Sequence, residues 1–143
     1  MFLEQAQEMN FEGVNEIEDG LELNIMPVGA LNLIKAVTII IMNISSNPDV
    51  QVDCVQSDLI SVILASLKMR DYEVTTHLYR AMGSYLTSQN QEIRRRAVHM
   101  ECLQEMLVAH ESSEFFRIRR ICSETLNNVA SIDPQMFELN DKL

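Results

Sequence analysis

Residues 47–67 read NPDVQVDCVQSDLISVILASL, and residues 90–110, 43 positions later, read NQEIRRRAVHMECLQEMLVAH. Apolar residues occupy the same positions in both stretches. The aligned pairs are Val50 with Ile93, Cys54 with Ala97, Val55 with Val98, Ile60 with Leu103, Ile63 with Met106 and Leu64 with Leu107. Self-similarity at a fixed distance of this size is typical of repeat proteins, in which each repeat packs on its neighbours.

The same pattern continues on both sides of these stretches. It aligns Tyr72 with Phe115, Leu78 with Ile121 and Leu86 with Val129. It also aligns the dipeptides Asn43-Ile44, Tyr85-Leu86 and Asn128-Val129, which lie 42 and 43 residues apart. The sequence therefore predicts a repeat with a period of 42–43 residues.

Each repeat contains the signals of three helices. Asn47 can cap a short helix with Pro48 at its first position, where the fixed φ of proline is tolerated. Ser57 or Asp58 can cap a second helix, and Asp71 can cap a long third one. Long helices fit the low content of four Gly and three Pro, because a β-sandwich or barrel needs more turn residues. The predicted fold class is all-α, built from three-helix repeats that stack on one another.

The period divides the chain into five segments. We predict an acidic N-terminal segment, a partial repeat that consists mostly of a third helix, two full repeats, and a second partial repeat that begins a first helix at Asp133-Pro134. These segments are residues 1–27, 28–46, 47–89, 90–132 and 133–143. A length of 143 residues fits a single domain.

Composition narrows the class of protein further. The longest apolar run, Ala30 to Ile44, is interrupted by Asn32 and Lys35 and is shorter than the roughly 20 residues of a membrane span, so we expect no transmembrane helix. The acidic N-terminus has no basic region of a secretory signal. The three cysteines are odd in number, which indicates free thiols in a reducing, intracellular compartment, cytoplasmic or nuclear.

Charge is distributed unevenly along the chain. The net charge is −10, and residues 1–66 contain ten acidic residues and a single base, Lys35. Phosphate binding depends on many cations acting together. We therefore expect no nucleic-acid partner.

Two stretches resemble the armadillo family: AVTIIIMNISSNPDVQVDCVQSDLISVILASL (residues 36–67) and RRICSETLNNVASIDPQ (residues 119–135). The resemblance covers about residues 28–143 and includes the Asn-Ile/Leu ending of the family's third helix. Ser57 and Met100 replace the glycine that commonly separates the first and second helices. The position of the family's Trp is occupied by Ile39, Ala81 and Glu124. The related HEAT repeat is a structural alternative.

The resemblance implies a right-handed α-solenoid of armadillo-like three-helix repeats. Its third helices would line a concave groove in which an asparagine of each repeat binds the backbone of an extended peptide. An amide suits this role because it offers both donors and an acceptor. The corresponding positions are Asn43, Tyr85 and Asn128, and two of the three are amides. The alternative is that each asparagine contacts only local backbone near a helix end.

Two helical turns before each of these positions stands a basic or potentially basic residue. Lys35, His77 and Arg120 lie eight residues earlier, with Ile39, Ala81 and Glu124 between, because i, i+4 and i+8 share a helix face. Cations beside backbone-binding amides favour an acidic, extended peptide. The absence of the Trp ladder argues against the basic peptides that the importin-α groove takes. The alternative is that these cations are ordinary solvated residues.

The acidic segment has two interpretations of its own. Residues 1–24 contain seven acids and no base. We expect a helix that caps the open end of the solenoid, since terminal repeats need a polar outer face. The second interpretation is that the segment lies over Lys35, His77 and Arg120 and blocks the groove.

No catalytic motif is present, so we expect a binding protein and not an enzyme. His99 and Cys102 lack the further ligands of a metal site, and no metal or cofactor is predicted. The leading function is a protein-protein interaction module for an extended acidic peptide. The alternative is a scaffold piece, either a homo-oligomer or a fragment of a larger repeat protein, that associates end to end through apolar residues such as Met136, Phe137 and Leu139.

Overall fold

The computed structural model describes residues 27–143, and in this range the chain is entirely α-helical, without a strand. This confirms the predicted all-α class. The elements are α3 (Val28–Ser45), α4 (Gln51–Gln56), α5 (Leu59–Ser66), the 3-10 turn η2 (Leu67–Met69), α6 (Tyr72–Leu86), α7 (Gln91–His99), α8 (Cys102–Ser112), α9 (Phe116–Ile132) and α10 (Gln135–Asp141).

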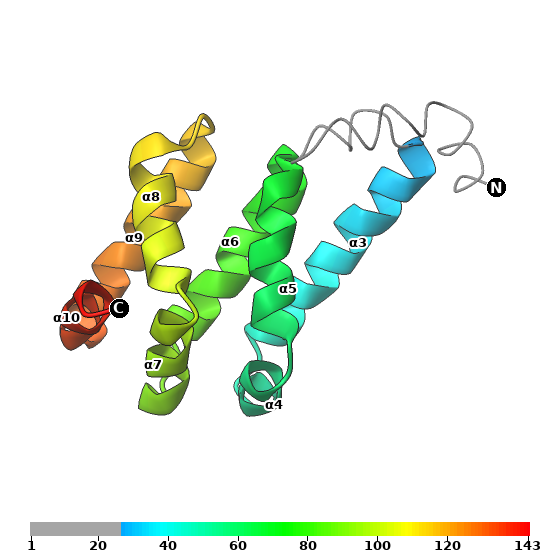
Figure 1. Ribbon diagram of the computed structural model, residues 1–143. Helices are drawn as coiled ribbons and strands as arrows, with labels where there is room; N and C mark the ends of the chain where they lie inside the picture. The colour runs from blue at the N-terminus through cyan, green and yellow to red at the C-terminus, as the bar shows by residue number, and fades with distance from the viewer. Residues whose placement is uncertain (1–26) are drawn as a thin grey trace.

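The helices form three sets that recur along the molecule. The long helices α3, α6 and α9 run side by side, and α6 contacts both of the others (Figure 1). The short helices α4, α7 and α10 form a second row along one end, in which α7 contacts both neighbours. Helices α5 and α8 pack on α6 and α9 respectively. Helices whose first residues are 40–44 positions apart in the sequence therefore occupy corresponding places in space.

Local sequence explains where the long helices begin. The carboxylate of Asp71 accepts a hydrogen bond from the backbone N–H of Val74 at 3.0 Å, and α6 starts directly after it, as predicted. Helix α3 starts after Pro27, whose lack of an N–H costs nothing at a helix start. Asn90 caps α7 by accepting from the N–H of Glu92 at 2.9 Å.

The predicted start of the first short helix is wrong. Asn47 does not cap a helix with Pro48 at its first position, because its side chain accepts from the N–H of Asp49 at 3.0 Å and closes a turn. A second turn follows, in which the N–H of Val50 donates to the carbonyl of Asn47 at 3.2 Å. Helix α4 begins only at Gln51. An Asn side chain that bonds backbone two residues on competes with the helical cap.

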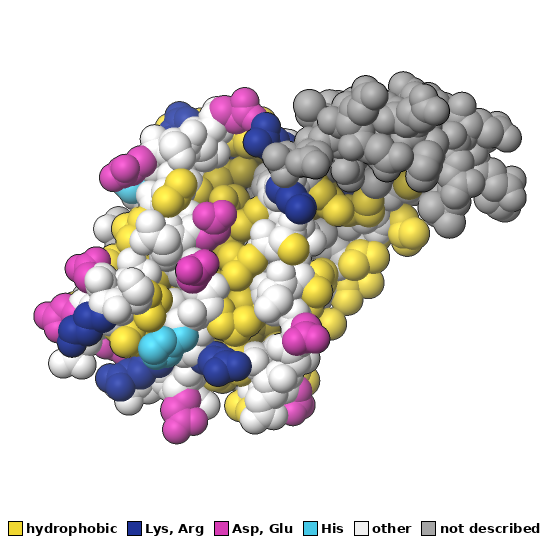
Figure 2. Space-filling view, viewed as in Figure 1, with side chains coloured by type: hydrophobic (Ala, Val, Ile, Leu, Met, Phe, Trp, Pro, Cys, Tyr) yellow, Lys and Arg dark blue, Asp and Glu magenta, His cyan; other side chains and the backbone are white. Residues whose placement is uncertain are grey.

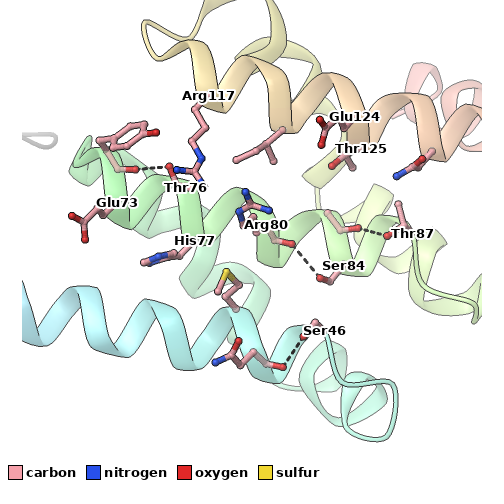
Figure 3. A pocket seen from close by; sticks show the side chains of 16 residues that line it. Ser46, Glu73, Thr76, His77, Arg80, Ser84, Thr87, Arg117, Glu124 and Thr125 are labelled. Carbon is pink, nitrogen blue, oxygen red and sulfur yellow. Dashed lines mark hydrogen bonds between the residues drawn. The ribbon is translucent and has the colours of Figure 1, made fainter.

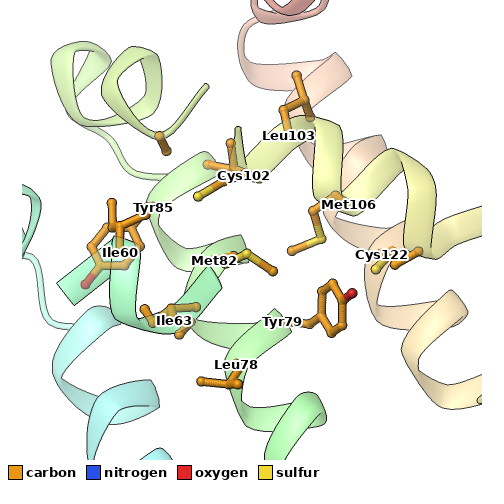
Figure 4. Close-up of a cluster of buried hydrophobic side chains, with 14 of the residues drawn as sticks. Ile60, Ile63, Leu78, Tyr79, Met82, Tyr85, Cys102, Leu103, Met106 and Cys122 are labelled. Atoms are coloured by element: carbon orange, nitrogen blue, oxygen red, sulfur yellow. The ribbon is translucent and has the colours of Figure 1, made fainter. Parts of the chain in front are cut away.

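The core lies between the layers and contains the apolar residues that define the repeat. Figure 4 shows Ile60 and Ile63 of α5 facing Met82 of α6, with Met106 of α8 on the other side of Met82. All four side chains have no exposed surface. Cys54, Cys102 and Cys122 are free thiols and are all buried. The alignment of apolar positions read from the sequence is thus an alignment of core positions.

A polar link recurs at two places 43 residues apart in the chain. Gln51 donates from Nε2 to the carbonyl of Ser45 at 2.8 Å, and Arg94, 43 residues later, donates from Nη1 to the carbonyl of Ser88 at 2.7 Å. Each of these side chains also contacts a residue at the end of the following long helix. Gln51 accepts from Ser88 Oγ at 2.8 Å, and Arg94 pairs with the buried carboxylate of Asp133 at 3.2 Å.

Helix α3 is covered less than the other long helices. Val28–Ser45 is long and apolar enough to cross a membrane by length and composition alone, and 11% of this window is buried. Core helices and N-terminal signal sequences satisfy the same test, so the expectation of no membrane span stays a prediction. The predicted cap helix of residues 1–27 lies almost wholly outside the described residues.

Candidate functional site

An open groove of about 850 Å³ runs across the three long helices. Every residue that lines it belongs to α3, α6 or α9 or directly follows α3 or α6. The polar and charged residues among them are Asn43, Ser46, Tyr72, Glu73, Thr76, His77, Arg80, Ser84, Thr87, Arg117, Glu124, Thr125 and Asn128. Figure 3 shows side chains from the facing helices directed into this space.

Four of the nine predicted site residues line the groove. Asn43 on α3 and Asn128 on α9 are exposed and lie in the two outer helices. His77 on α6 is half-buried, and Glu124 on α9 is exposed. The structure therefore brings together both predicted amides, the central histidine and one of the intervening residues.

Tyr85 and Ala81 were predicted in the groove, and this is wrong, because both are fully buried. The hydroxyl of Tyr85 donates to Ser45 Oγ at 2.7 Å inside the core. The reason is helical geometry: each step of four residues turns a side chain by about 40° beyond a full turn, so two steps give about 80°. Starting from His77, the i+8 position has rotated into the core.

The other three predicted residues lie at the edges. Ile39 is 40% exposed but does not line the groove. Lys35 also lies outside the lining, and its ammonium pairs with Glu73 at 3.6 Å. Arg120 pairs with Glu124 at 3.2 Å and lines a smaller adjoining pocket of about 480 Å³ that it shares with Arg80 and Phe116.

Sequence reasoning missed the two arginines of the groove, Arg80 and Arg117. Arg117 extends from α9 toward Thr76 and Arg80 of α6 (Figure 3). The signal that could have found them is a straight stripe with i, i+3/i+4 and i+7 spacing. On α6 this stripe is Glu73, Thr76, His77, Arg80, Ser84 and Thr87, and on α9 it is Arg117, Ile121, Glu124 and Asn128.

The carboxylates of the groove have ion-pair partners, whereas its two arginines have none among the described residues. Each carboxylate has a cationic partner at the rim, Lys35 for Glu73 and Arg120 for Glu124. Within residues 27–143, Arg80 and Arg117 form no ion pair within 4.0 Å. The groove therefore contains two exposed guanidinium groups. Each can bind a carboxylate or phosphate through two parallel N–H donors.

Hydrogen bonding inside the groove leaves donors for a ligand. Four of the hydroxyls that line it already donate to backbone carbonyls: Ser46 to Asn43 O, Thr76 to Tyr72 O, Ser84 to Arg80 O and Thr87 to Gly83 O. These residues can still accept hydrogen bonds. The nitrogen donors of the lining include the two asparagine amides and the two arginines.

His77 is held by a contact from α3. Thr38 Oγ1 lies 3.1 Å from His77 Nδ1 and itself donates to the carbonyl of Lys35 at 2.9 Å. The hydroxyl carries one hydrogen, so the direction of its contact with Nδ1 depends on the tautomer of the ring. The contact links α3 to α6 beside the groove.

Comparisons with family models, with curated proteins and with solved structures found no match to this chain. The site is defined by its own lining: an open, largely polar groove with an amide on each outer helix, Asn43 on α3 and Asn128 on α9, and with Arg80 and Arg117 from α6 and α9. Among residues 27–143 no group of three His, Cys, Asp or Glu side chains could hold a metal ion. The arrangement is suited to holding an extended chain through its backbone and its anionic side chains.

Proposed function

We propose that this chain is a protein-protein interaction module that binds an extended, acidic peptide in the groove between α3, α6 and α9. The observation that carries the proposal is the pair Arg80 and Arg117, which line the same groove as the amides of Asn43 and Asn128 and have no carboxylate partner within 4.0 Å among the described residues. Amides recognise a peptide backbone, and guanidinium groups recognise acidic side chains.

The proposed architecture is a short right-handed α-solenoid of armadillo-like three-helix repeats, with the HEAT repeat as the alternative. The recurring polar link of Gln51 and Arg94 supports equivalent units, because both side chains bond the carbonyl of a residue 6 positions earlier. In such folds each unit buries its apolar face only against its neighbours, and the concave face is a common binding surface. The free, buried thiols agree with an intracellular location.

The groove is more polar than an interface for another folded domain. Its lining contains both charged and amide side chains and few large apolar ones. A peptide would gain affinity from backbone hydrogen bonds and orientation from the two arginines. Electrostatic attraction would raise the association rate and would weaken with salt.

End-to-end association is the second candidate, and it has less support at the C-terminal end. Met136 is 1% exposed, and Phe137 and Leu139 are half-buried against the core. The apolar residues that would have to mediate such contacts are thus largely covered by α10's own neighbours.

The test is a titration of fluorescent peptides of matched length that carry either Glu or Lys at alternate positions. We expect the acidic peptide to bind and the basic one not to. Arg80→Glu/Arg117→Glu should weaken binding by more than about tenfold, since each charged hydrogen bond contributes about 1.5–3 kcal/mol.

The matched control is Arg95→Glu/Arg96→Glu, which changes the net charge equally on exposed residues outside the groove. This variant should bind almost as well as the parent chain. Equal weakening by both pairs would mean non-specific attraction, and equal binding of acidic and basic peptides would reject the proposal.

A further inference from the structure

The outer face of α3 is an unpartnered apolar surface. Four large side chains along it are 40–55% exposed: Leu33, Val37, Ile40 and Ile44. Their spacing of i, i+4, i+7 and i+11 places them on one stripe of the helix. Figure 2 shows apolar side chains gathered along this edge of the molecule. A stripe of this kind on a helix normally packs against another helix.

The equivalent stripes of the other long helices are covered. The residues 42 positions later on α6 are Thr75, Tyr79, Met82 and Leu86, and the residues 43 positions further, on α9, are Ile118, Cys122, Thr125 and Val129. All eight are at most 9% exposed. The exposed stripe of α3 therefore corresponds to positions that are buried in α6 and α9. No described helix packs over it.

Each of the other two long helices has the segment that directly precedes it packed on it, and α6 also contacts α8 and α9, which follow it. Helix α5 and η2, residues 59–69, pack on α6, which starts at Tyr72. Helix α8, residues 102–112, packs on α9, which starts at Phe116. Among the described residues α3 contacts α6 and, to a smaller extent, α4, so no helix occupies this place on it.

The segment before α3 has the length and the apolar pattern for this role. Val14, Ile17 and Leu21 have the spacing i, i+3 and i+7. The same spacing is found in Ile60, Ile63 and Leu67, which are buried where α5 and η2 pack on α6. In a helix, Glu16, Asp19 and Glu22 would lie on the other sides, and Glu18 at the edge of the apolar stripe.

We propose that residues 14–25 form a helix that covers Leu33, Val37, Ile40 and Ile44, and so complete the first unit as α5 and α8 complete the others. The occupant of the face is thus a segment of the same chain. This inference is independent of peptide binding, since the covered stripe is separate from the residues that line the groove.

The test is the reactivity of a single introduced cysteine in the full chain. The three natural thiols are buried, so a new exposed thiol dominates the reaction with a maleimide. Ile40→Cys is compared with Val108→Cys, because their parent side chains are 55% and 48% exposed in the described residues. We expect Ile40→Cys to react at least about tenfold more slowly at micromolar protein, since it reacts only after local opening.

The second arm removes the cover. Ile17→Asp/Leu21→Asp, added to Ile40→Cys, should bring its rate to within about threefold of Val108→Cys, because carboxylates oppose burial of that helix. The same pair added to Val108→Cys should leave its rate unchanged. Leu21→Ser is the milder substitution if circular dichroism shows that the aspartates unfold the chain.

Three outcomes would overturn the inference. Equal rates for Ile40→Cys and Val108→Cys would show that the face is open. Protection that increases with protein concentration, together with a dimer in sedimentation, would assign the face to a second copy. Protection that arises only when phosphatidylcholine vesicles are added would assign it to a lipid surface.

Discussion

Arg94 and Asp133 form the most deeply buried ion pair among the described residues, with side chains 10% and 8% exposed. A buried charge that loses its partner is costly, because it was removed from water. Arg94 also joins two units, since its Nη1 donates to the carbonyl of Ser88. The equivalent residue in the preceding unit, Gln51, makes the corresponding contacts without any charge.

Replacement of Arg94 alone should therefore lower the free energy of unfolding more than replacement of Arg94 and Asp133 together. We expect Arg94→Gln to lower the free energy of unfolding by about 3 kcal/mol, because the carboxylate of Asp133 stays buried without its cation. Arg94→Gln/Asp133→Ser places at this point the pair that Gln51 and Ser88 form in the preceding unit. It should recover at least about 1 kcal/mol of that loss.

Urea denaturation of the two single variants and the double variant measures this coupling. The informative comparison is between the double variant and the sum of the single effects. If the double variant is as unstable as that sum, the two links are not interchangeable.

The helices α5 and α8 occupy corresponding places, but the backbone conformation of the residue before each of them differs. Helix α8 begins after Glu101, which has φ of 72°, in the left-handed region. Its equivalent before α5 is Asp58, with φ of −84°. The same junction is thus built in two ways, and only the second unit requires a backbone conformation that glycine adopts without strain.

Glu101→Gly should raise the free energy of unfolding by about 0.5–1 kcal/mol, the net of relieved strain and the greater entropy of glycine in the unfolded chain. Asp58→Gly is the matched control at the junction without strain. It should lower stability by about 0.5–1 kcal/mol. Thermal or urea unfolding checks both signs, and a loss in both variants would show that Glu101 is not strained.

The element scale also accounts for the residues that sequence reasoning placed wrongly. A spacing of eight residues predicts Ala81 and Tyr85 on the groove face, and this is wrong, because both are buried. Arg80 and Arg117 were overlooked, although Arg80 lies three residues after His77 and Arg117 three before Arg120. Over two turns the difference between i+7 and i+8 decides between solvent and core.

At the scale of the whole molecule, the core is rich in groups that ionise only at high pH. Burial raises the pKa of the thiols of Cys102 and Cys122 from an ordinary value of 9.0 to about 12, with a smaller contribution from the charge of Glu105. Burial also raises the pKa of the Tyr79 and Tyr85 hydroxyls. These groups keep their protons in the folded state when the unfolded chain would release them.

Stability should therefore decrease above about pH 9. The folded pKa of each thiol lies above the unfolded one, so its contribution is fully present below pH 9.0 and is lost as pH rises toward 12. The midpoint of urea unfolding should be lower at pH 10 than at pH 8. Cys102→Ala/Cys122→Ala should reduce this difference, because alanine does not ionise, while lowering the midpoint at both pH values.

The sequence by itself determined the helical class, the correspondence of apolar positions 43 residues apart and the start of α6 after its cap, Asp71. It also pointed to Asn43 and Asn128, which line the groove. These features depend on contacts within a few residues, on capping and on the 3.6-residue period, so they can be read locally. Only the tertiary structure decided which stripe of each long helix faces the groove, that Tyr85 is in the core and that Arg80 and Arg117 share one channel. These outcomes depend on where α5, α8 and the neighbouring long helices pack, and packing between distant segments leaves no local pattern in the sequence.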